Sequence, residues 1–507
     1  MPAPPLLTSV AVDPALPVSR QDQIVGQLRA AILGGRLRPG TRLPPSRAWA
    51  GELGVARQTV VLAYERLVAE GYLESRVGAG TFVSAVLPET LLTVGPPQRA
   101  ATRAAPAAAA PEAGRKLSRR GAALRALRVT PAERRLLPLA PGVPALDAFP
   151  FAHWERLTTR LWKRRPADLL SYADPAGLPA LREAIASYLG TARGIECAPE
   201  QVLVVAGSQQ GIDLAARVLL DPGDAAWVED PAYVAARGAL AASGVRPVPV
   251  AVDAEGLDPA LGERLAPAAR LALVAPSHQY PLGVTMSLRR RLALLDWAER
   301  ADAWVLEDDY DSEYRYAGRP LRPLHALADR RAGRVLYLGT FSKVLAPGLR
   351  LGYLVVPPDL AAPFTAARAL ADRHAPAPTQ AVLADFIVEG HLAAHVRRMR
   401  LLYAERRDAL IRSVREEADG VLSADMPECG MHVAARLLIP CDDRAAYREA
   451  LARGLQTPPL SAFYADPDEA GRQGRRGFLL GFANTPAEAM PDAMRRLRAA
   501  VLAAAKT

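Results

Sequence analysis

The sequence predicts an α/β chain in two parts, a small helical unit that ends in a β-hairpin and a large α/β domain, joined by a long linker. Residues 15–84 show helical apolar periodicity followed by short strands with glycines between them. Residues 85–138 are rich in Ala, Pro and Arg and poor in bulky apolar residues, which is typical of a linker. Residues 139–507 alternate apolar runs with helix-length segments, which is typical of an α/β domain.

The composition limits the classes of function. The 507 residues are 50% hydrophobic and 23% charged, which excludes a chain that is disordered or membrane-embedded throughout. The sequence has no run of about 18 apolar residues and no pattern of a secretory leader, and this predicts a cytoplasmic protein. The three cysteines, Cys197, Cys429 and Cys441, are too few for a disulfide framework or a four-cysteine zinc site.

The net charge of +10 points to a polyanionic partner. Residues 85–138 contain ten Lys and Arg against three Glu. A solvated linker and a salt-sensitive, nonspecific contact with DNA explain this excess equally well. Only four of the 63 basic residues are lysines, so chemistry that needs a lysine has few candidates: Lys116, Lys163, Lys343 and Lys506.

Three helices are expected in the N-terminal unit. Ile24 and Leu28 lie on the inward face of the first. Ser46 is expected to cap the second, and the third begins near Ala56. Two short strands with a glycine-rich tip at residues 78–80 follow. This order of helix, helix, turn, helix and hairpin is that of a winged helix-turn-helix.

The third helix presents Arg57, Gln58 and Thr59 at its N-terminus, where a recognition helix meets base edges and phosphates. A small helical domain with solvated arginines would show the same pattern. The run GGRLRPGTRLPPSRAWAGELGVARQTVVLAYERLVAEGYLESRVGAGTFVS resembles the winged-helix domain of GntR-type bacterial regulators over nearly its full length. The resemblance implies that a double-stranded DNA operator contacts Arg42, Arg47, Arg57, Gln58, Thr59 and, in the wing, Gly80.

Lys343 lies in VLYLGTFSKVLAPGLRLGYLVV, at the carboxyl end of an expected strand, where α/β folds bind ligands. The other three lysines lie in solvated or terminal segments. A lysine that forms a Schiff base must be desolvated and held, and Lys343 alone has such surroundings in the sequence. A structural ion pair would place a lysine in the same way.

Two other expected strand ends carry polar residues. Residues 202–205 run into AGSQQG, a glycine turn and helix start whose free amides suit a phosphate. Residues 303–306 run into EDDYDSE, with five acids in seven positions. This acidic turn has no EF-hand spacing and no histidine, so we expect no metal there; a solvated turn is the simple interpretation. A pyridoxal phosphate site would need one such carboxylate to keep the ring nitrogen protonated.

From about Ala140 to Lys506 the chain resembles fold-type I aminotransferases that depend on pyridoxal phosphate (PLP). Its coupling to a GntR-type unit through a long linker is similar to that of the MocR/GabR family of bacterial transcriptional regulators. The resemblance implies a mostly parallel sheet with a small C-terminal α/β subdomain, PLP as cofactor, and a homodimer.

The resemblance also implies a role for each site residue. Lys343 would form the Schiff base with PLP, and Asp308 would pair with the pyridine nitrogen. Tyr310 would bond the ring hydroxyl, and Tyr233 would stack on the ring. The phosphate would be bound by Ser208, Gln209, Thr340 and Arg350, and by Tyr172 of the partner subunit.

The sequence departs from this pattern at two places. SHQYPLGVT has Tyr280 where aminotransferases usually carry Asn, which leaves the polar role to His278 or Gln279. In the strand FLLGFA, Leu479 replaces the arginine that commonly grips an amino-acid carboxylate, and Ala235 replaces a second arginine of GabR-like proteins. Three other arginines lie nearby in the sequence: Arg237, Arg475 and Arg476.

The sequence therefore predicts a homodimeric transcriptional regulator that binds DNA and PLP, and whose effector is PLP itself or an amine or amino acid. The two missing arginines favour PLP as the effector and vitamin B6 synthesis as the target. The alternative is an active PLP-dependent aminotransferase with an accessory DNA-binding unit. A scaffold without cofactor is disfavoured by Lys343, Asp308 and Arg350.

Overall fold

The computed structural model describes residues 10–76, 79–85, 117–118, 121–122, 124, 136–318, 322–328, 333–472 and 474–506. Contacts divide the chain into two compact units, Met1–Gly114 and Arg115–Thr507. This division falls within the expected linker, residues 85–138. Most of that stretch, including its basic residues, lies outside the described residues, so the limits of the linker stay a prediction. In the described part, no helix has both the length and the apolar character needed to span a membrane.

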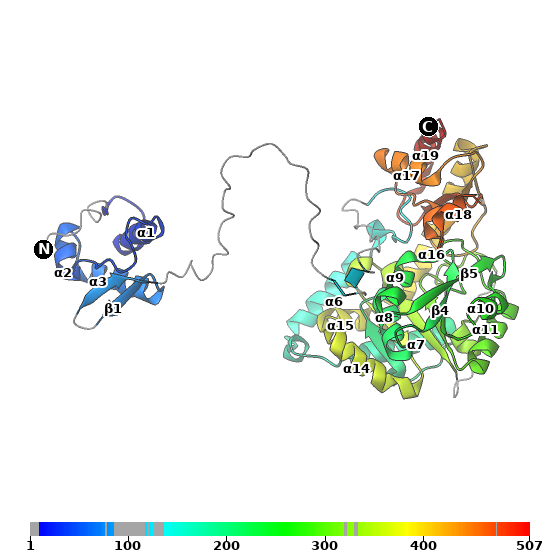
Figure 1. Ribbon diagram of the computed structural model, residues 1–507, viewed down its shortest axis with the longest axis horizontal. Helices are drawn as coiled ribbons and strands as arrows, with labels where there is room; N and C mark the ends of the chain where they lie inside the picture. The colour runs from blue at the N-terminus through cyan, green and yellow to red at the C-terminus, as the bar shows by residue number, and fades with distance from the viewer. Residues whose placement is uncertain are drawn as a thin grey trace. The chain divides into compact units, whose positions relative to one another are not determined.

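The N-terminal unit has the helices and the hairpin that the sequence predicts (Figure 1). Its elements are α1 Arg20–Leu33, α2 Ser46–Glu52, α3 Arg57–Ala69, and the antiparallel strands β1 Leu73–Arg76 and β2 Gly80–Val83. The three helices share one core, in which Trp49 stacks on Tyr64 with ring centroids 5.7 Å apart. The winged helix-turn-helix is thus confirmed.

The start of α2 differs from the prediction. Pro45 occupies the N-cap position, no side chain caps the helix, and Ser46 is its first helical residue. Proline fixes φ near the value that a helix entrance needs and holds the residue before it in extended backbone. The pair Pro44-Pro45 therefore sets the helix start, and the hydroxyl of Ser46 is not used as a cap.

The second unit is built on an eight-stranded sheet of order β3-β10-β9-β8-β7-β4-β5-β6. Strands β5, β4, β7, β8 and β9 are parallel, β10 is antiparallel to both of its neighbours, and β6 is antiparallel to β5. The strands are β3 Val202–Val205, β4 Ala225–Asp230, β5 Arg246–Asp253, β6 Gly256–Leu257, β7 Ala269–Val274, β8 Trp304–Asp309, β9 Val335–Thr340 and β10 Gly352–Val355.

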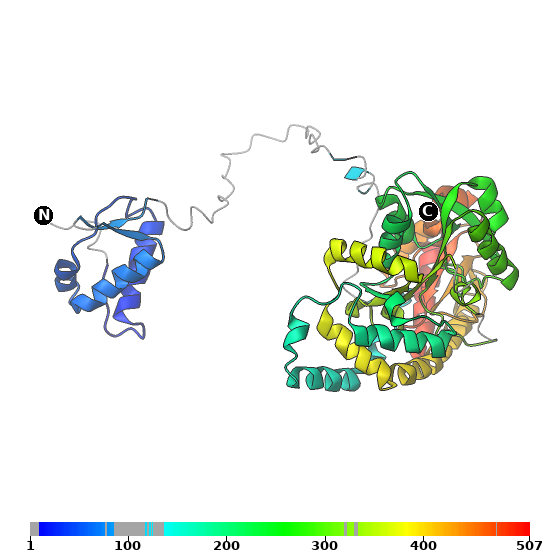
Figure 2. The same ribbon diagram turned by 90° about the horizontal axis from the view of Figure 1, so that it is seen from below.

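Helices cover both faces of this sheet (Figures 1 and 2). Because side chains alternate along a strand, Leu336 and Leu338 of β9 pack in one apolar cluster, while Val335 and Tyr337 lie in clusters of the other face. The helices are α6 Phe151–Lys163, α7 Pro179–Arg193, α8 Ser208–Leu219, α9 Val234–Ala242, α10 Pro259–Leu265, α11 Leu288–Arg300, α12 Leu324–Leu327, α13 Phe341–Val344, α14 Ala361–Asp372, α15 Ala377–Val388 and α16 His391–Glu417.

A small subdomain with its own core completes the second unit, as predicted. It consists of an antiparallel sheet of order β11-β12-β13, the C-terminal part of α16, and three further helices. We call the rest of the unit the large subdomain. The elements of the small subdomain are β11 Leu422–Ala424, β12 His432–Leu437, β13 Gly477–Gly481, α17 Asp443–Ala452, α18 Pro467–Arg472 and α19 Met490–Ala504.

Residues 137–145, which we call the crossing segment, are tied to the small subdomain. Leu139 donates its N–H to the hydroxyl of Thr485 at 2.9 Å, and its carbonyl accepts from the N–H of Gly481 at 2.9 Å. The N–H of Gln456 donates to the carbonyl of Pro138 at 3.1 Å. Within the described residues, the crossing segment therefore runs along the small subdomain before it reaches Lys343 in the large one.

The direction of the strands decides where the functional side chains lie. β3 and β9 are both antiparallel to β10, and β9 is parallel to β8, β7 and β4. The carboxyl ends of these five strands therefore meet at one edge of the sheet, where open α/β sheets bind their ligands.

Candidate functional site

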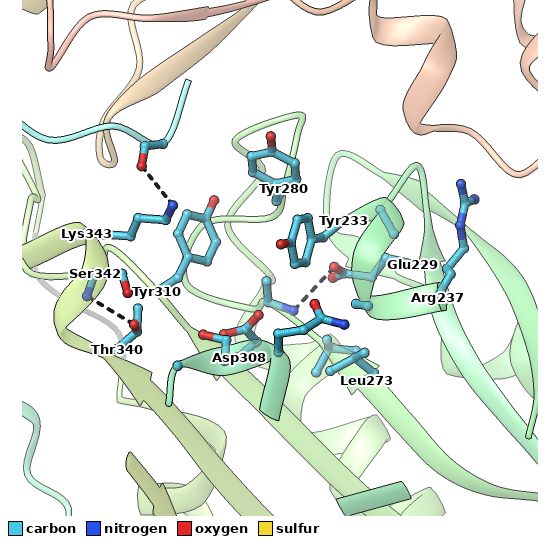
Figure 3. A pocket seen from close by; sticks show the side chains of 18 of the residues that line it. Glu229, Tyr233, Arg237, Leu273, Tyr280, Asp308, Tyr310, Thr340, Ser342 and Lys343 are labelled. Carbon is cyan, nitrogen blue, oxygen red and sulfur yellow. Dashed lines mark hydrogen bonds between the residues drawn. The ribbon is translucent and has the colours of Figure 1, made fainter. Parts of the chain in front are cut away.

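A cavity of about 310 Å³ lies at this edge of the sheet (Figure 3). It brings together the ends of β3, β8 and β9 with the starts of α8 and α9. Eight of the nine residues predicted to bind PLP line it; their individual roles stay predictions. They are Ser208, Gln209, Tyr233, Asp308, Tyr310, Thr340, Lys343 and Arg350.

Lys343 lies in the short helix α13, directly after β9, as its sequence context predicts. Its Nζ donates a hydrogen bond to the carbonyl of Gly142 at 2.8 Å, so the crossing segment closes over the lysine. Burial lowers the pKa of Lys343, and Asp311 and Asp308 offset part of this effect. A desolvated amine with a lowered pKa is a better nucleophile at neutral pH.

Asp308 lies near the end of β8, and its carboxyl group has hydrogen-bonding capacity that the protein does not use. Its Oδ1 is buried and has no hydrogen-bond partner. Burial, followed by the charge of Asp309, raises the pKa of Asp308 to about 7, although Lys343 and the hydroxyl of Ser208 act in the opposite direction. A buried carboxylate without a partner is costly. This group therefore favours a cationic or hydrogen-bond-donating ligand.

The start of α8 combines free backbone N–H groups with a nearby guanidinium, an arrangement that suits an anion. Gly207 precedes the helix with a φ of +111°, which a residue with a side chain rarely adopts. A Cβ atom there would lie 3.6 Å from both terminal nitrogens of Arg350. The hydroxyl of Thr340 accepts from the N–H of Ser342 at 3.1 Å and so holds the next turn in place. Helix-terminal N–H groups next to a guanidinium suit a phosphate.

Tyrosine rings form another part of the wall. Tyr233, 42% exposed, lies edge-on to Tyr280 at a centroid distance of 5.9 Å, and burial raises the pKa of Tyr233. Tyr280 itself lines the cavity, whereas His278 and Gln279 are buried away from it. Gln279 donates to the carbonyls of Pro231 and Tyr280 at 2.7 and 2.8 Å. The polar role expected of His278 or Gln279 is thus not one of lining the cavity.

Leu479, the residue expected in place of a carboxylate-binding arginine, lies among apolar side chains. Leu479 is fully buried in β13 and packs against Leu460 and Phe463, so this side of the small subdomain is apolar. Of the three arginines near in sequence, Arg237 lines the cavity (Figure 3). Arg475 lies over the ring of Tyr464, and Arg476 donates to a backbone carbonyl.

Arg237 lies one helical turn after Tyr233, on the same side of α9. Its guanidinium donates to the carbonyl of Tyr464 at 3.2 Å and lies 3.7 Å from a carboxylate oxygen of Asp230. Burial lowers the pKa of Arg237, and Asp230 offsets part of this effect. The cavity wall therefore contains one guanidinium besides that of Arg350.

Glu229 and Gly142 lie at the cavity but were not predicted from the sequence. Glu229 lines the cavity, and burial raises its pKa to about 8, although it accepts hydrogen bonds from the N–H of Ala275 and from Gln279, both at 3.3 Å. A signal for Glu229 was available, because it begins the segment EDPAY, which ends at Tyr233. Nothing in the sequence near Gly142 indicates its contact with Lys343.

Tyr172 lies outside the cavity of its own chain. It is 79% exposed, and the guanidinium of Arg373 lies 5.0 Å from its ring centroid. The expected contact of Tyr172 with the phosphate of a partner subunit, like the homodimer itself, stays a prediction.

The residues predicted to contact DNA lie on the surface of the N-terminal unit. Arg57 begins α3 and is exposed with Gln58, while Thr59 is half-buried. Arg47 is exposed on α2. The remaining two lie together, because a Cβ atom at Gly80 would lie 3.1 Å from Nε of Arg42. Gly78, at the tip of the wing, lies outside the described residues.

Comparisons with known families match both units. Residues 20–83 match the family described as bacterial regulatory proteins, gntR family, and residues 138–472 match aminotransferase class I and II. The chain is 41% identical over 495 residues to the probable rhizopine catabolism regulatory protein MocR of Rhizobium meliloti, covering 97% of this chain and 95% of the relative. It is 33% identical over 483 residues to the HTH-type pyridoxine biosynthesis transcriptional regulator PdxR of Corynebacterium glutamicum, covering 94% of each.

A solved structure resembles the second unit. The kynurenine aminotransferase of Pyrococcus horikoshii, in complex with PMP, superimposes with a TM-score of 0.65 at 30% identity, covering 73% of this chain and 91% of that one. The regulators match both units in the same order, whereas the enzyme matches the aminotransferase unit. This chain therefore belongs to the MocR-type regulators of the GntR family, in which a winged-helix unit precedes an aminotransferase class I and II domain.

Proposed function

We propose that this protein is a transcriptional regulator that binds PLP, and that its aminotransferase-like domain senses PLP or an amine or amino acid and so alters operator binding by the winged helix. One observation carries the proposal. In a chain that has a DNA-binding unit, the lysine amine of Lys343 and the unpartnered carboxyl oxygen of Asp308 line the same cavity.

The groups of the cavity fit PLP. The free oxygen of Asp308 is an acceptor for a protonated ring nitrogen. The backbone turn at Gly207 and the guanidinium of Arg350 lie together at the start of α8, where a bound phosphate is favoured. Tyr233 offers an aromatic face. When bound, PLP supplies an electrophilic carbonyl carbon that reacts with amines.

The proposed role of each side chain follows from its position. Lys343, whose pKa is lowered, provides the amine that attaches PLP to the protein. Asp308 keeps the ring nitrogen protonated, and Tyr310 contacts the ring hydroxyl. The phosphate is held by Ser208, Gln209, Thr340 and Arg350, and by Tyr172 of the partner subunit in a homodimer.

Two features bear on the effector. The apolar packing of Leu479 removes one carboxylate site, which favours PLP itself as the signal and genes of vitamin B6 synthesis as targets. A relative at 33% identity is named as a regulator of pyridoxine biosynthesis. Arg237 in the cavity wall favours the other choice, an amine that carries an anionic group.

The presence of Arg237 also supports a second candidate, an active PLP-dependent aminotransferase. A guanidinium in the wall could orient the carboxylate of an amino acid while the amine of Lys343 moves protons. A keto product formed from an amino donor at a rate that depends on Lys343 would favour this candidate over pure sensing.

The first test is the visible absorption spectrum of the purified full chain, recorded before and after addition of PLP and then of a panel of amino acids. We expect a visible band that Lys343→Ala abolishes and that Lys163→Ala, at an exposed lysine of α6, leaves unchanged. Operator binding is measured in the same samples. A band that persists in Lys343→Ala, or operator binding that ignores every addition, would refute the proposal.

A further inference from the structure

The carbonyl of Val344, in the residue directly after Lys343, accepts hydrogen bonds from two buried side chains. The helix α13 has four residues, so its last carbonyl has no N–H donor within the helix. His395 of α16 supplies one donor, with its Nε2 atom 3.1 Å from the carbonyl oxygen. The hydroxyl of Tyr314 supplies the other at 3.2 Å. Both side chains are buried, with 5% of the surface exposed for His395 and none for Tyr314.

The start of α13 is held by separate contacts. The N–H of Phe341 donates to the carbonyl of Leu351 at 3.1 Å, and the N–H of Ser342 donates to the hydroxyl of Thr340 at 3.1 Å. Lys343 therefore lies in a single helical turn that is fastened at both ends. Because the backbone is fixed on either side of Lys343, the direction in which its side chain enters the cavity is fixed as well.

The contacts of His395 determine which of its ring nitrogens carries the hydrogen. A terminal nitrogen of Arg398 lies 3.2 Å from Nδ1 of His395, and a guanidinium can only donate hydrogen bonds. Nδ1 is therefore the acceptor, and the hydrogen of the neutral imidazole lies on Nε2, which is directed at the carbonyl of Val344. The same nitrogen of Arg398 donates to the carbonyl of Ala148 at 2.8 Å, which keeps the guanidinium beside the ring.

The surroundings keep both donors neutral. Burial, followed by the charge of Arg398, lowers the pKa of His395 to about 4, although the hydrogen bond to Val344 acts in the opposite direction. Burial raises the pKa of Tyr314 well above its usual range, so the phenol keeps its hydrogen. Near neutral pH the carbonyl of Val344 therefore meets two uncharged donors, and the contact needs no counter-charge in the protein interior.

We infer that His395 is a positioning residue for Lys343: its hydrogen bond to the carbonyl of Val344 holds the lysine where it meets its ligand, and Arg398 selects the ring form of His395 that can donate. The inference rests on the proposed function, in which the amine of Lys343 attaches PLP. Neither His395 nor Arg398 lines the cavity. Their effect on a ligand must therefore pass through the backbone next to Lys343.

The test compares PLP with pyridoxamine phosphate (PMP), which has an amine in place of the aldehyde and cannot condense with a lysine. Both affinities are measured by calorimetric titration of the full chain. His395→Leu removes the donor and should weaken the binding of PLP about fivefold to tenfold, as expected for the loss of one hydrogen bond. The affinity for PMP should change less than about twofold, because PMP uses the ring and phosphate contacts but is not attached to Lys343.

Three further variants separate positioning from general loosening. His395→Gln keeps a side-chain N–H donor close to the place of Nε2 and should restore most of the affinity for PLP. Arg398→Met should weaken the binding of PLP in the same direction as His395→Leu, because the ring can then carry its hydrogen on either nitrogen. Together, Arg398→Met and His395→Leu should lose no more than His395→Leu alone, since Arg398 acts through His395. Arg397→Met, at the neighbouring exposed arginine of α16, is the matched control and should leave both affinities unchanged.

Thermal unfolding shows whether each variant is folded. His395→Phe replaces His395→Leu if that variant does not fold, and Arg398→Met changes an exposed side chain and so remains a test in either case. Equal losses of affinity for PLP and PMP, no recovery in His395→Gln, or an unchanged affinity for PLP in Arg398→Met would overturn the inference. A wild-type protein with no visible band after addition of PLP would refute the proposed function, and the inference with it.

Discussion

Asp308→Asn is expected to stabilise the protein without PLP and to weaken its binding of PLP. The reason is the surroundings of the carboxyl group, which is buried at the end of β8 with one oxygen unpartnered and a pKa raised to about 7. Without a ligand, the folded protein must bury an ionised carboxylate at alkaline pH. An amide of the same shape carries no such charge.

The sign and size follow from the pKa. The unfolded carboxyl has its ordinary pKa of 3.8, and the folded one titrates at about 7. Between these values the folded state holds more protons than the unfolded state, so stability falls as the pH rises through this window. With 1.36 kcal/mol for each pKa unit, a difference of about 3 corresponds to ~4 kcal/mol lost by the wild-type chain at pH 8. Asp308→Asn avoids this loss at pH 8. Its stability advantage over the wild type disappears near pH 4.

The assay is urea unfolding of the full chain at pH 5 and pH 8, with and without PLP, with Asp296→Asn as an exposed control on α11. Without PLP, Asp308→Asn should be more stable than the wild type at pH 8 and much closer to it at pH 5. With PLP the order should reverse at pH 8, because the wild-type carboxylate gains the ring nitrogen as its partner. Equal gains at both pH values would refute the pKa argument, and undiminished affinity for PLP would refute the role of Asp308.

Three further predictions concern other parts of the molecule. Arg57→Ala should weaken binding to the specific operator far more than binding to random duplex, measured by fluorescence anisotropy; equal losses would mean that Arg57 contacts only phosphate. Gly352→Ala would place a Cβ atom 2.9 Å from the carbonyl of Gly339 and 3.1 Å from Cα of Gly207, so it should cost about 1–3 kcal/mol in urea unfolding and also weaken PLP binding; unchanged stability would contradict this. Trp297→Ala removes a buried ring stacked 3.8 Å from Trp227 and should cost about 3–5 kcal/mol; a loss below 1 kcal/mol would show that the site collapses around the gap.

Much of the fold could be predicted because its signals are local. Apolar runs at 202–205 and 335–338 that end in small polar residues predict strands that lead into ligand-binding turns, and the structure has β3 and β9 there. The helices of the N-terminal unit follow from their period and their glycine stops. The error at Ser46 arose where two local signals competed, since the prolines before it determine the helix start.

The parts of the site that were not predicted depend on contacts between distant segments. Whether Arg237 or Arg475 lines the cavity depends on the packing of α9 against the loop at Tyr464, which no spacing reveals. The burial of Leu479 could be expected from an apolar strand, but its packing against Phe463 could not. The contact of Gly142 with Lys343 spans 201 positions of the chain.

That last contact places the chemistry of the cavity next to the chain that leads to the DNA-binding unit. Gly142 lies four residues beyond position 138, the predicted end of the linker, and its carbonyl is the hydrogen-bond acceptor of the Lys343 amine. The same stretch is fastened to β13 through Leu139. A ligand that binds the amine removes the hydrogen-bond donor of Gly142, and the half-buried carbonyl must then find another partner. Binding of a ligand at the Lys343 amine would therefore change the hydrogen bonding of the segment that directly follows the predicted linker.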